Sequence, residues 1–354
     1  MRILEIGDRA LFKRERPEAT TLVWSGPDHA LPSRLDALAL DAGVARSIVG
    51  DIASGRYDAV VWHPPERDPW RDARWGLANP RAWRAWRVVL GLRRVPGVPL
   101  IVVDTRDDRR PTRTAAAMFD RADAVFLREF PLDAGELGLD EADPVLAKFR
   151  PLSIGLGRER LEAMPVAPVA KTHDLFFAGQ VDTPLRRDGL PGLRALAREG
   201  LRVDLPEGRL PSAEFYRRCA SARIVWSPEG RGWQCFRHYE AAACGAVALM
   251  NRPSIRQHAE LVDGVHALYY DPAPGALATA VREALADPSR LARIAEAGRV
   301  RVLENHTHAA IVERVVAAIH EWSPGVNRRR PIPPDRRSAG HGAPAGSTGL
   351  DRRR

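Results

Sequence analysis

The sequence predicts an α/β protein with two doubly wound domains that face each other, each a mostly parallel sheet with helices on both faces. Two observations lead to this fold class. Apolar segments rich in Val, Ile and Leu alternate with helical segments in two separate series, which is typical of parallel sheets buried on both faces. The chain of 354 residues also suits two domains, because a domain commonly takes about 150 residues.

The first series predicts a domain over residues 1–150. Its strands are the apolar segments "MRILEI" (1–6), "TTLVW" (20–24), "YDAVVWH" (57–63), "VPLIVVD" (98–104) and "ADAVFL" (122–127). Helices are predicted over 31–44 and 79–95, the second opening on Asn79-Pro80, an N-cap followed by a proline in the first helical position. The Pro-rich segment 151–170 is irregular and is the predicted linker.

The second series predicts a domain over residues 171–305. Its strands are expected at 173–179, 201–205, 223–227, 246–250 and 267–271, and its helices at 184–200, 211–222, 276–287 and 291–304. A last helix is predicted in 306–323, where apolar residues recur at helical spacing from Ile311 to Trp322. Two domains of this kind usually hold a ligand in the cleft between them.

The composition favours a cytoplasmic protein. The hydrophobic fraction is 45%, ordinary for a globular chain, and no apolar run approaches the roughly 18 residues of a membrane span. The apolar start is too short for a signal peptide. The three cysteines, Cys219, Cys235 and Cys244, form no CxxC pair, which indicates reduced thiols and no zinc site.

The net charge of +9 is concentrated at the end of the chain. Residues 324–354 carry +6 of it and are rich in Pro, Gly and Arg, so this tail is predicted to be disordered. The rest of the chain is close to balanced, and no nucleic-acid partner is expected. The tail remains a candidate for weak peripheral contact with the anionic inner face of a membrane. It also leaves open an alternative, a binder of nucleic acid or anionic surfaces.

The segment "SPEGRGWQCFRHYEAAACGAVALMN" (227–251) carries a family resemblance. With "FFAGQ", "EFYRRCASARIVWSP" and "HAELVDGVHALYYDP", it resembles the donor domain of GT-B glycosyltransferases of the "glycosyl transferases group 1" type, over roughly residues 171 to 322. The arginine three positions before Glu240 also resembles the exostosin-like and spore-maturation branches. The family's other common glutamate falls at Gly232 here. The first half, with "YDAVVWHPP", "RADAVFLRE" and "PLSIGL", is a weaker match.

The chemistry of this segment suits a diphosphate. Gly230 and Gly232 allow close backbone approach, and the helix that follows points its positive end at the same place. Arg237 can pair with phosphate oxygens, and Glu240 can accept hydrogen bonds from ribose hydroxyls. The alternative is an exposed i,i+3 salt bridge between these two residues. The predicted donor site is completed by residues that the resemblance adds: Gly179, Arg186, Ser227 and Glu260.

The resemblance assigns the acceptor to the first domain. His63 and Asp104 end strands there and are the candidate catalytic residues, with a satisfied loop histidine and a turn-capping carboxylate as the alternatives. Trp70 and Trp75 are candidate acceptor-stacking residues. No metal is expected: GT-B enzymes do not depend on one, and the segment "DTRDD" gives only a weak DxD-like pattern.

The resemblance thus implies a hexosyltransferase-type enzyme. Its partners would be a nucleoside diphosphate sugar and a hydroxyl acceptor (a glycan, lipid or small molecule), with no further cofactor, and the last helix would cross back to the first domain. Gly232 in place of the family's glutamate keeps a catalytically silent nucleotide-sugar-binding protein open. A nucleotide-sugar epimerase of the same fold is a third alternative.

Overall fold

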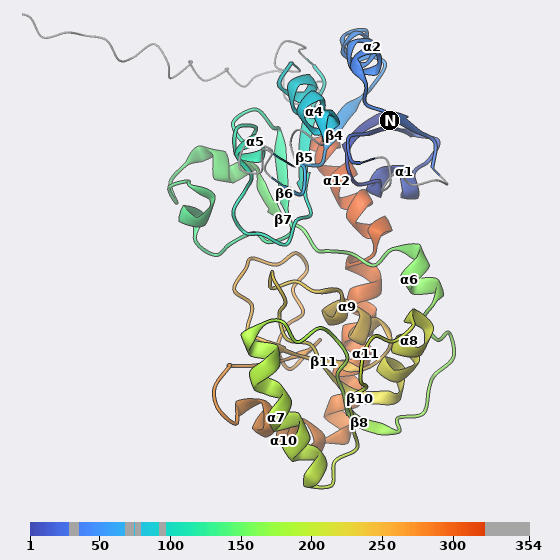
Figure 1. The fold of residues 1–354 in the computed structure, drawn as a ribbon, viewed down its shortest axis with the longest axis vertical. Helices are drawn as coiled ribbons and strands as arrows, with labels where there is room; N and C mark the ends of the chain where they lie inside the picture. The colour runs from blue at the N-terminus through green and yellow to red at the C-terminus, as the bar shows by residue number, and fades with distance from the viewer. Residues whose placement is uncertain (28–34, 68–73, 75–78, 92–96, 323–354) are drawn as a thin grey trace, which may run out of the picture.

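The computed structural model describes residues 1–27, 35–67, 74, 79–91 and 97–322. These residues form two parallel β-sheets with flanking helices, one above the other along the long axis of the molecule (Figure 1). The predicted α/β class with two doubly wound domains is confirmed. The predicted tail at 324–354 lies outside the described residues.

The first sheet has seven parallel strands in the order β3-β2-β1-β4-β5-β6-β7. They are β1 (Ile3–Gly7), β2 (Thr20–Trp24), β3 (Ala37–Ala39), β4 (Ala59–Trp62), β5 (Leu100–Asp104), β6 (Ala124–Leu127) and β7 (Phe149–Pro151). The helices of this domain are α1 (Leu11–Glu15), α2 (Ala42–Ala53), α4 (Pro80–Gly91) and α5 (Arg113–Ala116), with the 3-10 turns η3 (Ala134–Leu137) and η4 (Pro144–Lys148). The central strands are buried along their whole length, as their continuous apolar sequences require.

Two sequence expectations for this domain are wrong in detail. Residues 37–39 of the predicted helix form the edge strand β3, which pairs in parallel with β2. The helix begins only at Ala42, because the Asp41 carboxylate accepts the Val44 N–H at 2.8 Å and caps it there. The chain just before the predicted linker is also more regular than expected, since β7 adds a seventh strand beside β6.

The second sheet has five parallel strands in the order β12-β11-β10-β8-β9. They are β8 (His173–Phe176), β9 (Val203–Asp204), β10 (Ala222–Trp226), β11 (Val247–Asn251) and β12 (Leu268–Tyr270). The helices are α6 (Arg158–Glu162), α7 (Pro184–Arg198), α8 (Ser212–Ser221), α9 (Phe236–Ala243), α10 (Ala276–Ala286) and α11 (Pro288–Asn305). Apolar clusters fill both faces of this sheet.

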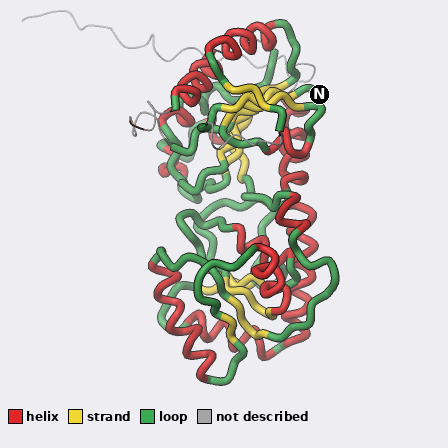
Figure 2. The backbone as a smooth tube through the Cα atoms, turned by 45° about the vertical axis from the view of Figure 1, so that its right-hand side comes forward, coloured by secondary structure: helices red, strands yellow, loops and turns green. Residues whose placement is uncertain are grey.

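The last helix, α12 (His308–Trp322), follows the second domain in sequence but packs on the first (Figures 1 and 2). Its apolar face joins the cluster formed by β1, β4, β5 and α1, and comprises Ile311, Val312, Val315, Val316 and Ile319. The Arg16 guanidinium after α1 also bonds both carboxylate oxygens of Glu313, at 2.5 and 2.7 Å. The two ends of the described chain therefore stabilise the same domain.

Candidate anion-binding site between the domains

The loops that follow β8, β10 and β11 leave the second sheet at one edge, because these strands run parallel. The loop after β10 spans residues 227–235 and leads directly into α9. Seven of the eight residues of α9 are buried, including Arg237, His238 and Glu240. The polar residues of this helix are therefore buried, and each needs a hydrogen-bond partner from the protein or from a bound ligand.

Arg237 is a buried cation without a hydrogen-bond partner for two of its nitrogens. Its side chain is 9% exposed, and its Nε and Nη1 have no partner among the described residues. The guanidinium lies 4.9 Å from the Phe177 ring centroid and fills the space where a Cβ on Gly179 would be. Burial lowers the pKa of Arg237, and the nearby charge of Arg186 lowers it further. Buried donors without a partner call for an acceptor, and an anion is the acceptor that suits a guanidinium best.

Arg186 lies beside the same loops. From the first turn of α7 its Nε donates to the Glu229 carbonyl at 3.0 Å and its Nη1 to the Gln180 carbonyl at 3.1 Å. A Cβ on Gly230 would lie 2.9 Å from Arg186 Nη2. The structure therefore brings four of the predicted donor-site residues together, Gly179, Arg186, Gly230 and Arg237.

Glu240 does not form the exposed salt bridge with Arg237 that the sequence left open. Its carboxylate, 5% exposed, forms a short ion pair with Arg160 of α6 and accepts the Tyr216 hydroxyl of α8 at 3.0 Å. The Arg160 guanidinium also lies 3.8 Å from the Phe236 ring centroid. Glu240 thus bonds α9 to α6 and α8. It lies about one turn of α9 after Arg237.

Ser227 is placed differently from the prediction. Its side chain is fully buried and its hydroxyl bonds His238 Nδ1 at 2.7 Å. His238 Nε2 lies 2.7 Å from the Trp233 carbonyl and must donate to it, which leaves Nδ1 to accept from Ser227. Burial lowers the pKa of His238 to about 3. The hydroxyl of Ser227 therefore supports the loop from inside and is not presented to a ligand.

Glu260 is exposed on the loop between β11 and β12. It follows Ala259, whose φ of 46° is the only positive value outside glycine among the described residues. No hydrogen bond or ion pair joins Glu260 to Arg186 or Arg237 within the described chain. The donor-site role of Glu260 stays a prediction.

The two predicted catalytic residues are both committed to partners. His63 is 1% exposed, with Nε2 at 2.9 Å from a Glu5 carboxylate oxygen and Nδ1 at 3.1 Å from the Val103 carbonyl. Asp104 is 5% exposed and pairs with Arg106, whose Nη2 lies 2.6 Å from Asp104 Oδ2. Both side chains are thus bonded within the first domain, and Asp104 also lines the pocket described below. Their catalytic roles stay predictions. Trp70 and Trp75 lie outside the described residues.

The first domain contributes a residue that sequence reasoning missed. Glu129 follows β6, and its carboxylate accepts the backbone N–H groups of Trp233 at 2.8 Å and Gln234 at 2.9 Å. The only available signal was the charged pair Arg128-Glu129 directly after a buried strand. That position lies at the carboxyl edge of the first sheet, where ligand-facing residues gather.

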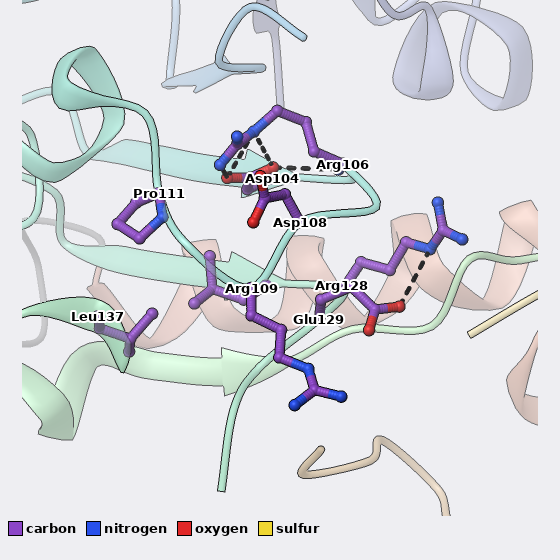
Figure 3. Close-up of a pocket in the computed structure, with 9 residues that line it drawn as sticks. Asp104, Arg106, Asp108, Arg109, Pro111, Arg128, Glu129 and Leu137 are labelled. Carbon is purple, nitrogen blue, oxygen red and sulfur yellow. Dashed lines mark hydrogen bonds and ion pairs between the residues drawn. The ribbon is translucent and has the colours of Figure 1, made fainter. Parts of the chain in front are cut away.

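Glu129 also lines a small pocket, open to solvent, at the carboxyl ends of β5 and β6 (Figure 3). The lining is Asp104, Arg106, Asp108, Arg109, Pro111, Leu127, Arg128, Glu129 and Leu137. Arg109 reaches across to bond the Ser254 hydroxyl of the second domain. No group of three or more potential metal ligands occurs in the described chain.

Comparison with known proteins places this architecture in a class. Two doubly wound domains, with a last helix that returns from the second to the first, make up the GT-B architecture. Residues 193–317 match the family described as glycosyl transferase-like. No curated protein matches the sequence. None of the helices in the described ranges has the length and apolar character needed to cross a membrane.

Solved glycosyltransferases share the fold over nearly the whole chain. Sucrose-phosphate synthase from Thermosynechococcus elongatus superimposes with a TM-score of 0.55 at 14% identity, covering 91% of this chain and 99% of its own. HepE from Anabaena in complex with UDP gives 0.54 at 13% identity, covering 91% and 100%. HepE with UDP-glucose gives 0.51 at 14%, covering 91% and 100%. The predicted GT-B fold is thereby confirmed, and the family match supports the predicted resemblance over residues 193–317, in the second half of the chain.

Proposed function

We propose that this protein is a glycosyltransferase that moves a sugar from a nucleoside diphosphate sugar to a hydroxyl acceptor. The observation that carries the proposal is the Arg237 guanidinium, buried with two unpartnered nitrogens beside the charge of Arg186. A buried cation without a partner is costly, and a bound diphosphate would supply the missing anion and acceptors. Gly179 and Gly230 leave room for the two guanidinium groups themselves, because a side chain at either position would overlap one of them.

The chemical role of the site is stabilisation of the leaving diphosphate. As the glycosidic bond breaks, negative charge grows on the diphosphate, and fixed cations together with the positive end of α9 stabilise that charge. Glu240, held by Arg160 and Tyr216, is the proposed ribose contact, since a carboxylate accepts hydrogen bonds from hydroxyl groups. The acceptor would approach from the first domain, and domain closure would exclude water.

A titration of UDP, GDP, ADP and CMP into the wild type and Arg237→Ala tests the donor site. UDP is the first choice because HepE, which shares the fold, was solved with UDP and UDP-glucose. We expect one diphosphate to bind, and Arg237→Ala to weaken it by about 10- to 100-fold, the effect of losing charged hydrogen bonds. The matched control is Arg282→Ala, which removes an exposed arginine of α10 that pairs with Glu199, the residue after α7. Binding that survives Arg237→Ala unchanged would contradict the proposal.

A nucleotide-sugar-binding protein without transfer activity is the second candidate. The specific observation in its favour is that His63 and Asp104 are both buried and already bonded, to Glu5 and Arg106. Release of free diphosphate from the donor that binds, measured with and without hydroxyl acceptors, separates the two functions. Transfer gives release that depends on an acceptor, whereas a pure binding protein gives none. Conversion of the donor sugar without acceptor would instead indicate an epimerase.

A further inference from the structure

Glu129 lies in the first domain, but its carboxylate is bonded to the backbone of the second. The carboxyl group is fully buried and accepts the N–H groups of Trp233 and Gln234. It occupies the place of the side chain that Gly232 lacks, because a Cβ there would lie 2.6 Å from Glu129 Cδ. The glycine and the carboxylate are thus complementary parts of one contact between the domains.

Neighbouring bonds hold this contact from both sides. Arg128 Nη2 donates to the Gln234 carbonyl at 2.6 Å, and Gln234 Nε2 donates to the carbonyls of Arg128 and Leu152, the latter at 2.8 Å. The Arg128 guanidinium forms its close ion pair with Asp107, while its Nε is 3.9 Å from Glu129 Oε1. Glu129 is therefore bonded more closely to the two amides than to its neighbouring arginine, whose longer ion pair with Glu129 is drawn in Figure 3.

The two amides belong to the segment that sets the anion site. They directly precede α9, whose first turn carries Arg237, and they follow Gly230, which packs on Arg186. Without an acceptor these N–H groups would be buried and unsatisfied, and the segment would have to move toward water to satisfy them. Movement of this segment would displace Gly230, which contacts Arg186, and the start of α9, which carries Arg237.

We propose that Glu129 is a positioning residue for the donor diphosphate, supplied by the opposite domain. The inference rests on the proposed function and adds that the diphosphate site is complete only while the first domain is docked on the loop after β10. Donor binding and domain closure are then coupled through one carboxylate. A carboxylate has the same sign of charge as a diphosphate, so the proposed role is to hold the segment in place and not to bind the ligand.

The variants follow from the contact. Glu129→Gln keeps the shape but offers one acceptor where two N–H groups need one each, and Glu129→Ala removes both. Gly232→Ala places a methyl group against the carboxylate of Glu129. The backbone at residue 232 lies outside the left-handed region, so the alanine clashes with Glu129 without straining the backbone. The double variant Glu129→Ala with Gly232→Ala removes that clash. Glu18→Gln, an exposed glutamate of the same domain, is the control for the change in charge.

The decisive measurement is the ratio of the affinities for a nucleoside diphosphate and the monophosphate of the same base, taken with UDP and UMP first. We expect Glu129→Gln to lower this ratio by about tenfold, as the loss of one charged hydrogen bond would. Gly232→Ala should lower it similarly, and the double variant should match Glu129→Ala alone because the two residues share one contact. General loss of stability would weaken both ligands equally and leave the ratio unchanged.

Hydrogen exchange of the free protein separates the possible failures. Glu129→Gln should speed exchange at the amides of residues 233 and 234, and Glu18→Gln should not. If exchange and the affinity ratio both stay at wild-type values while Arg237→Ala still weakens binding, the role of Glu129 is refuted and the proposed function stands. If the wild type binds none of the diphosphates tested, the proposed function fails and the positioning role fails with it.

Discussion

Gly179 and Arg237 are packed against each other so closely that the guanidinium occupies the place of a side chain at residue 179. The glycine follows β8 and the arginine lies on α9, so the contact joins two loops that leave the sheet at the same edge. It fixes the guanidinium over Phe177, with two nitrogens still unpartnered. The position of the cation thus depends on a residue without a side chain.

Substitution of this glycine should therefore displace the cation. In Gly179→Ala the new methyl group overlaps Arg237 Nη2, and we expect diphosphate affinity to fall by about 10- to 100-fold. Gly192→Ala on α7 is the control, since nothing lies within 4 Å of the place that a Cβ would take there. The control should keep affinity and raise the free energy of unfolding by about 0.5–1 kcal/mol. Calorimetric titration and urea unfolding of the three proteins measure both effects, and equal affinities would contradict the assignment.

Removal of the buried cation should separate stability from binding. Arg237→Met replaces unsatisfied donors by an apolar side chain, and we expect the free energy of unfolding to rise by about 1–3 kcal/mol, the cost of leaving buried donors unpaired. The same variant should lose diphosphate binding. A substitution that removes function and raises stability is expected where a buried side chain is left without partners so that it can bind a ligand. Denaturant unfolding without ligand measures the gain, and a clear loss of stability would mean that Arg237 has a structural partner.

Glu240 and Tyr216 allow the ribose contact to be tested apart from packing. Glu240→Ala should weaken the diphosphate by about 10- to 100-fold and also destabilise the fold, because the Tyr216 hydroxyl, 2% exposed, loses its acceptor. Tyr216→Phe removes only the hydroxyl and should leave affinity within about twofold, a change below about 0.5 kcal/mol. If Tyr216→Phe weakens binding as much as Glu240→Ala does, the carboxylate acts through α8 and not on the ligand.

The stability of the protein should fall in acid through its buried histidines. Burial lowers the pKa of His238 to about 3, below the ordinary value of 6.5. Between these values the unfolded chain binds a proton that the folded chain does not, so His238 contributes stability above pH 6.5 that is lost as the pH falls toward 3. Over this range His238 contributes about 1.4 kcal/mol per pH unit to the slope of the free energy of unfolding against pH. His258, His306 and His308, also with lowered pKa values, act in the same direction.

The variant His238→Gln checks this share. Its unfolding free energy, measured in urea at intervals from about pH 6.5 to about pH 4, should fall less steeply than that of the wild type. Its value at neutral pH should be lower, because Ser227 and the Trp233 carbonyl lose a partner. Identical slopes in the two proteins would show that His238 takes up its proton in the folded state.

Much of the fold could be predicted from the sequence because its signals are local. Buried parallel strands are continuous apolar segments, and the amphipathic period of α12 fits His308–Trp322 as predicted. The predictions of secondary structure were wrong where the local sequence pattern and the tertiary contacts favour different structures. Residues 37–39 have a helical composition but pair with β2 at the sheet edge, and β7 is too short to give an apolar pattern.

The site was predicted in part for the same reason. Gly230, Arg237 and Glu240 lie within one loop and one helix, so their spacing in the sequence already suggested a shared site. The partners of these residues come from elsewhere in the chain. Glu240 bonds Arg160 and not Arg237, and Gly232 faces a carboxylate from the other domain.

The sequence by itself determined the two α/β domains, the glycine loop and the charged helix that follows it, because these depend on neighbouring residues. Only the tertiary structure decided which charges remain without partners. Docking of the first domain places Glu129 over Gly232, and packing of the first sheet buries His63 on Glu5, whereas Arg237 is left with open donors. Such pairings depend on strand order and domain contact, which bring together residues distant in sequence and which no local period encodes.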